Sequence, residues 1–209
     1  MTDPLFIGYY TRASRYEHEA DSIRVSLDAL GLAHDFTGIE TLGSWQKNTQ
    51  AKPGVIREFI AKYPGRRLIY VDVDAYVIER PGLFWALDCD FSAVMYDANE
   101  LLSGTLYILA NERSAAVVNR WMDICRQFPD NLPDGRAAWD QRCLLMAINE
   151  HRKIGLKFKE LPHSYCWMIG VSQKHFPDTR PIILHKDGGS AWKEKPTWEC
   201  RDGKWLVVT

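Results

Sequence analysis

The chain has 209 residues, of which 46% are hydrophobic and 25% are charged. This is ordinary globular composition and excludes a largely disordered chain, and the length suits a single domain over residues 1–209. The 26 basic side chains nearly balance the 27 acidic ones, so the net charge gives no sign of a dedicated nucleic-acid or anionic-membrane binder. No apolar run approaches the roughly 18 residues that cross a bilayer, and the first residues lack a secretion signal. We therefore expect a cytoplasmic protein.

The predicted elements alternate between strands and helices. An apolar run at 5–10 predicts a buried strand, and apolar side chains recurring every three or four residues from Tyr16 to Leu30 predict a helix that Gly31 ends. Further apolar runs predict strands at 33–39, 68–71, 91–95, 106–109, 157–161 and 182–184, and helices at 53–62, 83–87, 111–128 and 138–149. This alternation indicates an α/β fold with a mainly parallel central sheet flanked by helices. Such sheets bind ligands beyond the carboxyl ends of their strands.

Five cysteines are scattered along the chain, and none is spaced Cys-x-x-Cys. An odd, dispersed set argues against a zinc site or a disulfide framework. We expect reduced, mostly buried thiols at Cys89, Cys125, Cys143, Cys166 and Cys200.

Two carboxylates, Asp72 and Asp74, directly follow the predicted strand at 68–71. Hard oxygen ligands at a strand tip suit Mg²⁺ or Mn²⁺, which in turn can neutralise a diphosphate. The alternative is a pair of carboxylates that caps a turn before Tyr76. A chain of this composition contains roughly one Asp-x-Asp by chance, and a second one, Asp88-Cys89-Asp90, precedes a predicted strand. It belongs at the opposite end of the sheet, and we interpret it as a turn.

Several further segments occur in the order found in nucleotide-diphospho-sugar transferases with the GT-A fold. The chain resembles in particular the small families that carry an Asp-x-Asp strand end and a late histidine. The matching segments are Tyr9-Tyr10-Thr11 followed by Tyr16, Gly43-Ser44-Trp45 with Lys52-Pro53, Tyr70 to Ala75, Ser103 to Tyr107, Trp139-Asp140-Gln141, and Leu184 to Gly188. The resemblance spans residues 9–188 and implies a single GT-A-like domain. A Lys-Pro-Trp ending, usual in these families, is only loosely echoed by Ala191-Trp192-Lys193.

The resemblance implies a metal site made of Asp72, Asp74 and His185. Two carboxylates and one imidazole suit Mn²⁺ slightly better than Mg²⁺. A lone histidine at the end of an apolar strand is more often structural, but the Gly188-Gly189 loop after it is similar to the families' His-x-x-Gly element.

The resemblance also implies a set of donor-binding residues. Tyr10 or Thr11 would contact the nucleotide base, with Tyr16 near its face unless Tyr16 is a core residue of its helix. Lys52 would reach the donor phosphate unless it is a solvated surface lysine. The remaining implied residues lie beside the donor sugar: Ser103 and Gly104, whose alternative is a plain strand entry, Gln141, and Asp140, whose alternative is a helix-start carboxylate.

The function implied is metal-dependent transfer of a sugar from a nucleotide-sugar donor, a UDP-sugar, to an unidentified acceptor. Asp140 would bind donor hydroxyls in a retaining reaction or act as base in an inverting one. One rival is an aspartyl-nucleophile phosphatase of the HAD-like type, in which Asp72 attacks phosphorus and Asp74 is the acid/base. Tyr76 and the late position of the motif count against it. Another is a non-catalytic protein that binds nucleotide sugars or glycans.

Four tryptophans are candidates for exposed, sugar-stacking residues. They are Trp45, Trp139, Trp167 and Trp192. The acceptor stays open between a glycan, a lipid-linked glycan, a protein and a modified nucleobase.

Overall fold

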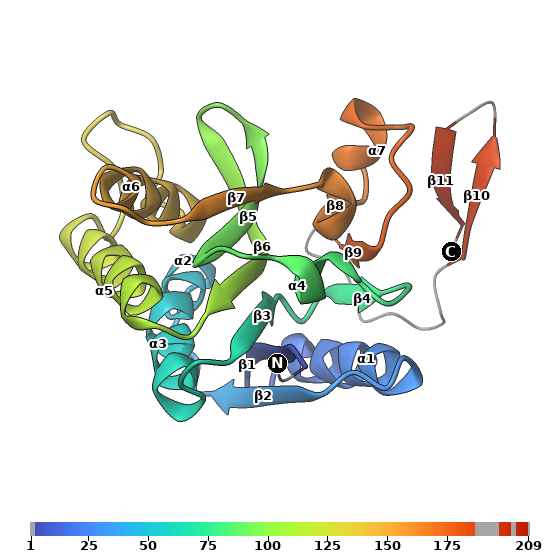
Figure 1. Cartoon of the computed structure of the whole chain (residues 1–209), viewed down its shortest axis with the longest axis horizontal. Helices are drawn as coiled ribbons and strands as arrows, with labels where there is room; N and C mark the ends of the chain where they lie inside the picture. The colour runs from blue at the N-terminus through green and yellow to red at the C-terminus, as the bar shows by residue number, and fades with distance from the viewer. Residues whose placement is uncertain (1–2, 187–196, 202–203, 209) are drawn as a thin grey trace.

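A six-stranded sheet forms the centre of the computed structural model (Figure 1), which describes residues 3–186, 197–201 and 204–208. Strand β6 runs antiparallel to its neighbours β3 and β5, and the other pairs are parallel, so five strands share one direction. The strands in spatial order are β2 (His34–Ile39), β1 (Leu5–Thr11), β3 (Arg67–Val71), β6 (Glu100–Leu109), β5 (Phe91–Asp97) and β7 (Phe158–Leu161). The expectation of a mainly parallel sheet is confirmed.

Helices cover both faces of this sheet because its strands alternate their side chains between two cores. In β3, Leu68 and Tyr70 enter one core, whereas Ile69 and Val71 enter the other. This period of two places apolar side chains on both faces of a central strand. The first core includes α3 (Lys52–Lys62), α5 (Glu112–Gln127) and α6 (Asp140–Arg152), and the second includes α1 (Arg15–Ala29) and α4 (Leu83–Ala86).

A smaller, three-stranded sheet lies beside the main one, and the residues directly after Asp74 form one of its strands. In it β4 (Ala75–Val77) pairs antiparallel with β9 (Ile183–His185), which pairs in parallel with β8 (Trp167–Met168). The remaining elements are α2 (Trp45–Gln50), a 3₁₀ turn (His163–Tyr165), α7 (Ser172–His175) and the hairpin of β10 (Thr197–Arg201) and β11 (Lys204–Val208).

The predicted long helices and central strands are confirmed to within a few residues, whereas short elements were missed. Helix α2 and strands β4 and β8 are too short for a periodic pattern to emerge. Strand β6 begins at Glu100, six residues before the predicted start at residue 106, so Ser103 and Gly104 lie inside a strand and not before it. Gly31, with φ of +62°, follows the end of α1 as predicted.

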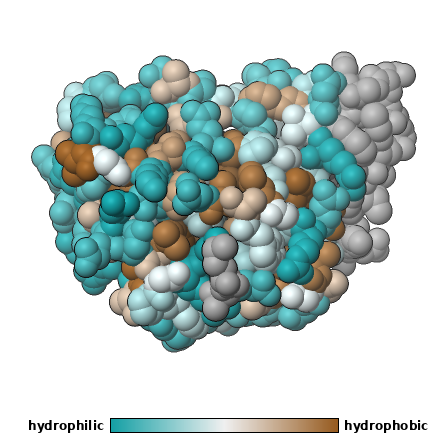
Figure 2. Space-filling view, viewed as in Figure 1, coloured by the Kyte–Doolittle hydropathy of each residue, from teal (hydrophilic) through white to brown (hydrophobic). Residues whose placement is uncertain are grey.

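The described cysteines are free and buried, as the sequence predicted. Cys89, Cys125, Cys143 and Cys166 are buried and unbridged, and the side chain of Cys200 lies outside the described residues. The face in Figure 2 is mostly hydrophilic, with hydrophobic residues gathered toward its middle. Within the described part of the chain, no helix is both long and apolar enough to span a bilayer.

Candidate functional site

A cavity of about 360 Å³ lies where β1 and β3 end. All the residues that the sequence predicted for the site line it, although they come from segments far apart in the chain. They are Tyr10, Thr11, Tyr16, Lys52, Asp72, Asp74, Ser103, Gly104, Asp140, Gln141 and His185. The structure therefore brings the whole predicted set to one place.

Asp72 and Asp74 occupy the turn that leads from β3 into β4. The backbone N–H of Asp72 donates to the Gly104 carbonyl at 2.9 Å, and the N–H of Ala75 donates to the Asp72 carbonyl at 3.1 Å. Val73 between them is buried, whereas both carboxylates are half-buried and line the cavity. The turn thus brings both carboxylates to the cavity.

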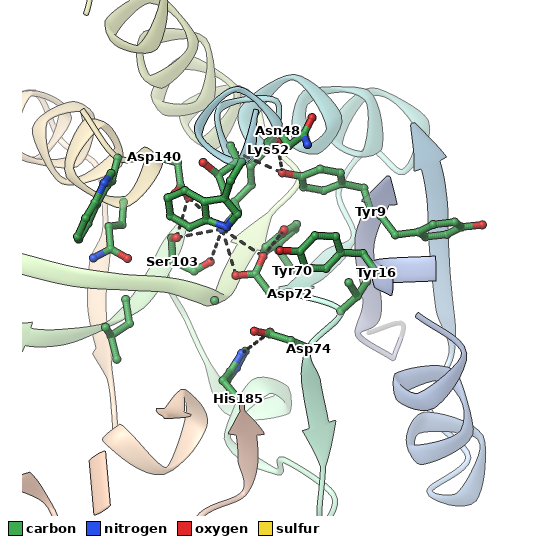
Figure 3. Close-up of a pocket in the computed structure, with 18 of the residues that line it drawn as sticks. Tyr9, Tyr16, Asn48, Lys52, Tyr70, Asp72, Asp74, Ser103, Asp140 and His185 are labelled. Atoms are coloured by element: carbon green, nitrogen blue, oxygen red, sulfur yellow. Dashed lines mark hydrogen bonds and ion pairs between the residues drawn. The ribbon is translucent and has the colours of Figure 1, made fainter. Parts of the chain in front are cut away.

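Lys52 is the centre of a buried ionic cluster on the cavity wall (Figure 3). Its Nζ lies 3.2 Å from Asp72 Oδ1 and 2.9 Å from Asp140 Oδ2. Only 2% of the residue is exposed, so the surface-lysine interpretation is wrong. Burial lowers the pKa of Lys52, but the two carboxylates outweigh it and raise that pKa above its ordinary value. Lys52 therefore stays charged and holds both carboxylates in place.

Asp140 opens helix α6, yet its side chain is used in the cavity. The Ser103 hydroxyl donates to Asp140 Oδ2 at 2.7 Å, and Lys52 Nζ donates to Ser103 Oγ at 3.0 Å. The Trp121 indole N–H donates to the Asp140 carbonyl at 2.8 Å, which fixes the start of the helix. The adjacent Gln141 amide donates to Glu100 Oε1 at 2.6 Å.

Asp74 and His185 form a second pair in the cavity. Strands β4 and β9 pair Ala75 with His185. Because Ala75 directly follows Asp74, this register brings His185 close to Asp74. His185 Nδ1 lies 3.5 Å from Asp74 Oδ1, and Nε2 lies 2.9 Å from Thr105 Oγ1. Burial lowers the pKa of His185, but Cys166 and Asp74 outweigh burial and raise it to about 10.

Gly104 lies close to the side chains of His185 and Cys166. A Cβ there would lie 3.0 Å from His185 Cε1 and 3.2 Å from Cys166 Sγ. A side chain at this position would therefore need one of these two neighbours to shift by a few tenths of an ångström.

The donor atoms of the predicted metal site fit a divalent cation by chemistry. Among the described residues, no group of three His, Cys, Asp or Glu is already arranged to hold a metal, because Asp72 turns to Lys52 while Asp74 faces His185. One further acidic side chain, that of Glu19, interacts with the charge of Asp74. Glu19 is 1% exposed and neither of its carboxylate oxygens has a hydrogen-bond partner among the described residues. Burial and the charge of Asp74 raise its pKa to about 7.

The predicted base-binding loop follows β1. Thr11 Oγ1 lies 2.8 Å from Ser14 Oγ, and Ala13 between them has a φ of +52°, a left-handed conformation that is strained for alanine. Tyr16 packs partly against the core, as its place on the helix predicted, and it also lines the cavity. Its contact with a nucleotide base stays a prediction. The guanidinium of Arg24 lies 5.3 Å from the centre of the Tyr10 ring.

Two tyrosines of the cavity were not predicted from the sequence. The Tyr70 hydroxyl donates to Asp72 Oδ1 at 2.6 Å, and the Tyr9 hydroxyl donates to the Asn48 carbonyl at 2.6 Å. Tyr70 lies two residues before Asp72 on the same strand face, a spacing that was a usable signal. Tyr9 is two residues before Thr11 on β1 and offers the same signal.

The tryptophans divide between surface and core. Trp45 and Trp139 are 57% and 38% exposed and line the cavity. Trp167 is fully buried, so its expected exposure was wrong: β8 places it in a small core with Tyr76 and Leu184. Trp192 lies outside the described residues.

Comparisons with known proteins place the fold. No protein-family model and no curated protein matches the sequence. Among solved structures, the chain is similar to a glycosyltransferase involved in the glycosylation of the major capsid of PBCV-1, with 10% identity over 90% of this chain and 95% of that one and a TM-score of 0.66. The fold is that of the GT-A glycosyltransferases.

Two other similar structures agree. Glycosyltransferase GlyE of Streptococcus pneumoniae TIGR4 has 15% identity and a TM-score of 0.64, and the match covers 88% of this chain but 54% of GlyE. The galactosyltransferase LgtC, solved in complex with donor and acceptor sugar analogs, has 11% identity over 87% of this chain and 86% of that one, with a TM-score of 0.53. At these identities the likeness concerns the fold, and the predicted fold class is confirmed.

Proposed function

We propose that this protein is a glycosyltransferase that moves a sugar from a nucleotide-sugar donor, a UDP-sugar, to an acceptor and depends on Mn²⁺ or Mg²⁺. The observation that carries the proposal is the convergence of Asp72, Asp74, Asp140 and His185 on one cavity at the carboxyl ends of the strands of a GT-A sheet. Ligand binding at this edge is the rule for open α/β sheets.

Each wall of the cavity has a distinct task in this proposal. Tyr10, Thr11 and Tyr16 bind the nucleotide base. Asp72, Asp74 and His185 hold the cation, which when bound stabilises the charge that develops on the departing diphosphate.

The opposite wall binds the donor sugar. Asp140 contacts sugar hydroxyls or accepts the proton of the acceptor hydroxyl, and Lys52 Nζ forms an ion pair with the Asp140 carboxylate at 2.9 Å. Ser103 orients Asp140 through its 2.7 Å hydrogen bond. Lys52 itself is held by Asp72, Asp140 and Ser103, so its first task is to position these groups.

The phosphatase alternative loses support from the fold. Asp72 follows β3, not the first strand, and its Oδ1 already accepts a hydrogen bond from Tyr70. The binding-protein alternative differs only in outcome: it predicts metal-dependent donor binding without transfer or donor hydrolysis.

A thermal-shift assay tests the donor site. The protein is melted with a panel of nucleoside diphosphates and nucleotide sugars in Mn²⁺, in Mg²⁺ and in EDTA. We expect a rise in Tm with a uridine nucleotide that disappears in EDTA and in Asp74→Ala but persists in Asp88→Ala, an exposed aspartate at the other sheet edge. No rise in Tm with any nucleotide under any metal would contradict the proposal. Donor hydrolysis or transfer by the same samples separates the enzyme from the binding protein.

A further inference from the structure

Two exposed indoles meet at the cavity. Among the described residues only five large hydrophobic side chains are exposed, and two of them are Trp45 and Trp139. Both line the cavity, and their rings contact each other edge to face, with centroids 6.5 Å apart and planes at 89°. Leaving large aromatic surface in water forgoes the stabilisation of burial. A paired exposure at a cavity is therefore a feature of binding and not of folding.

We propose that Trp45 and Trp139 form the acceptor subsite and that the acceptor is a saccharide whose pyranose ring packs against an indole. The inference rests on the proposed function. A sugar ring has an apolar C–H face and a rim of hydroxyls, so it needs an aromatic surface with hydrogen-bonding groups at its edge. Gln141 lines the cavity with the tryptophan pair and supplies such a group; its amide is oriented by the hydrogen bond to Glu100, and Asp140 directly follows Trp139.

The two indoles are held in place by hydrogen bonds between their segments. Trp45 opens α2, whose side chains reach across to the chain that leads into α6. Gln46 Nε2 donates to the Pro129 carbonyl at 2.9 Å, and Gln50 Nε2 donates to the carbonyl of Ala138, next to Trp139, at 2.9 Å. A preorganised aromatic corner loses little entropy on binding a ligand.

Arg142 fixes the second indole. Its guanidinium carbon lies 4.3 Å from the centre of the Trp139 ring, and its NH1 donates to the Ala137 carbonyl at 3.1 Å. The same guanidinium lies 3.7 Å from Glu100. A cation stacked on an indole orients the ring, so the arginine and Trp45 together set the position of Trp139.

The position of the pair separates an acceptor from the donor's base. Figure 3 shows Asp140 and Ser103 on the opposite side of Asp72 from Tyr16. If the base binds near Tyr16 and the diphosphate near Asp72, the sugar is transferred on the side of Asp140, the residue that directly follows Trp139. The exposure of both indoles places them at the open side of the cavity, from which an acceptor enters.

Titration with free saccharides tests the subsite. Methyl glucosides, methyl galactosides, lactose, maltose and cellobiose are added to the protein with UDP and Mn²⁺, and tryptophan fluorescence and calorimetry report binding. We expect at least one saccharide to bind, and we expect Trp45→Ala and Trp139→Ala to weaken it about tenfold each. Trp45→Phe and Trp139→Phe, which keep an aromatic face, should retain most of the affinity. Ile154→Ala, at an exposed apolar residue outside the cavity, is the matched control.

Three results would overturn the inference. The first is UDP binding without binding of any saccharide, which leaves the proposed function intact and removes the saccharide acceptor. The second is saccharide affinity that is the same in the alanine variants and in the wild type. The third is a loss of affinity for a UDP-sugar but not for UDP in the alanine variants, which would assign the pair to the donor sugar. A wild-type protein that binds no nucleotide would instead contradict the proposed function. The two failures are distinguishable, because a saccharide titration without UDP measures binding at the tryptophans independently of the nucleotide.

Discussion

Two Asp-x-Asp sequences lie at opposite ends of the strands of one sheet, the first at the carboxyl ends and the second at the amino ends, and their surroundings differ. Asp72 and Asp74 follow β3, whereas Asp88 and Asp90 precede β5, and both strands run antiparallel to β6 and hence in the same direction. The first pair is half-buried and lines the cavity. In the second pair Asp88 is exposed and Asp90 is 3% exposed.

The partners of Asp90 are all structural. Its Oδ1 accepts from Asn111 Nδ2 at 2.7 Å, and its Oδ2 accepts from the backbone N–H of Lys157 at 3.0 Å. Asn111 caps α5, and Lys157 directly precedes β7. The Asp90 carboxylate therefore connects the start of β5 to the starts of α5 and β7. The interpretation of Asp88-Cys89-Asp90 as a turn at the amino edge is confirmed. A carboxylate whose partners all belong to the fold stabilises the fold.

The largest difference between the two motifs is expected in activity. Asp74→Asn should lower metal-dependent transfer or donor hydrolysis by about a hundredfold or more, because a charge that stabilises the transition state is lost. Asp90→Asn should keep activity within about twofold when assayed well below its Tm. Nucleotide-sugar turnover is measured for both variants. Equal losses of activity in the two variants would contradict the functional distinction between the two Asp-x-Asp sequences.

Stability should show the reverse order. Asp90→Asn is expected to cost about 2–3 kcal/mol at pH 7, since the Lys157 N–H loses a charged acceptor in a buried site. Burial raises the pKa of Asp90, but hydrogen bonds from Lys157 and Asn111 and the charge of Arg113 outweigh it and lower that pKa. A lowered pKa means that the contribution is present above the ordinary value of 3.8 and is lost as the pH falls through the native value.

Urea unfolding at pH 7 and pH 3 measures this contribution. The free energies of unfolding of the wild type and Asp90→Asn should differ by more at pH 7 than at pH 3. A difference that does not depend on pH would assign the loss to shape and not to charge.

At Glu19, whose carboxylate interacts with Asp74, we expect a smaller effect on the free energy of unfolding, with the opposite dependence on pH. Its native pKa of about 7 lies above the ordinary 4.5, because burial and the charge of Asp74 outweigh Arg15 and Lys186. The wild type should therefore lose stability as the pH rises from about 4.5 to 7 and no more above it. Glu19→Gln removes this loss and should gain about 1–2 kcal/mol at pH 8 in EDTA, with no gain at pH 4.

Urea unfolding in EDTA checks this gain, with Glu58→Gln, an exposed glutamate on α3, as the control. A gain at pH 4 as large as at pH 8 would show that the carboxylate charge is not its cause.

The smallest effect is expected within the structural motif itself. Asp88→Asn replaces an exposed side chain and should change the free energy of unfolding by less than about 0.5 kcal/mol. The same urea experiment at pH 7 compares it with Asp90→Asn. A loss as large as that of Asp90→Asn would show that the tripeptide acts as a unit and not through one buried carboxylate.

Local periodicity accounts for what could be predicted of the fold. Long helices such as α5 and buried strands such as β3 repeat an apolar pattern over enough residues to be recognised. The strand-end position of Asp72 and Asp74 follows from the apolar run before them. The two-residue strand β8 has no such pattern, so the burial of Trp167 was missed: it comes from pairing with β9.

The contacts of the site depend on the packing of distant segments. The amino-acid order placed Lys52 at a helix start and Asp140 at another, but only the packing of α3 and α6 into one core brings the Lys52 ammonium within 2.9 Å of the Asp140 carboxylate. Likewise the register that sets Ala75 opposite His185 brings Asp74 to the imidazole. Burial along a strand or helix is a local property that residue spacing expresses. Which carboxylate meets which cation depends on crossovers and strand register, and these are settled only when the whole sheet has formed.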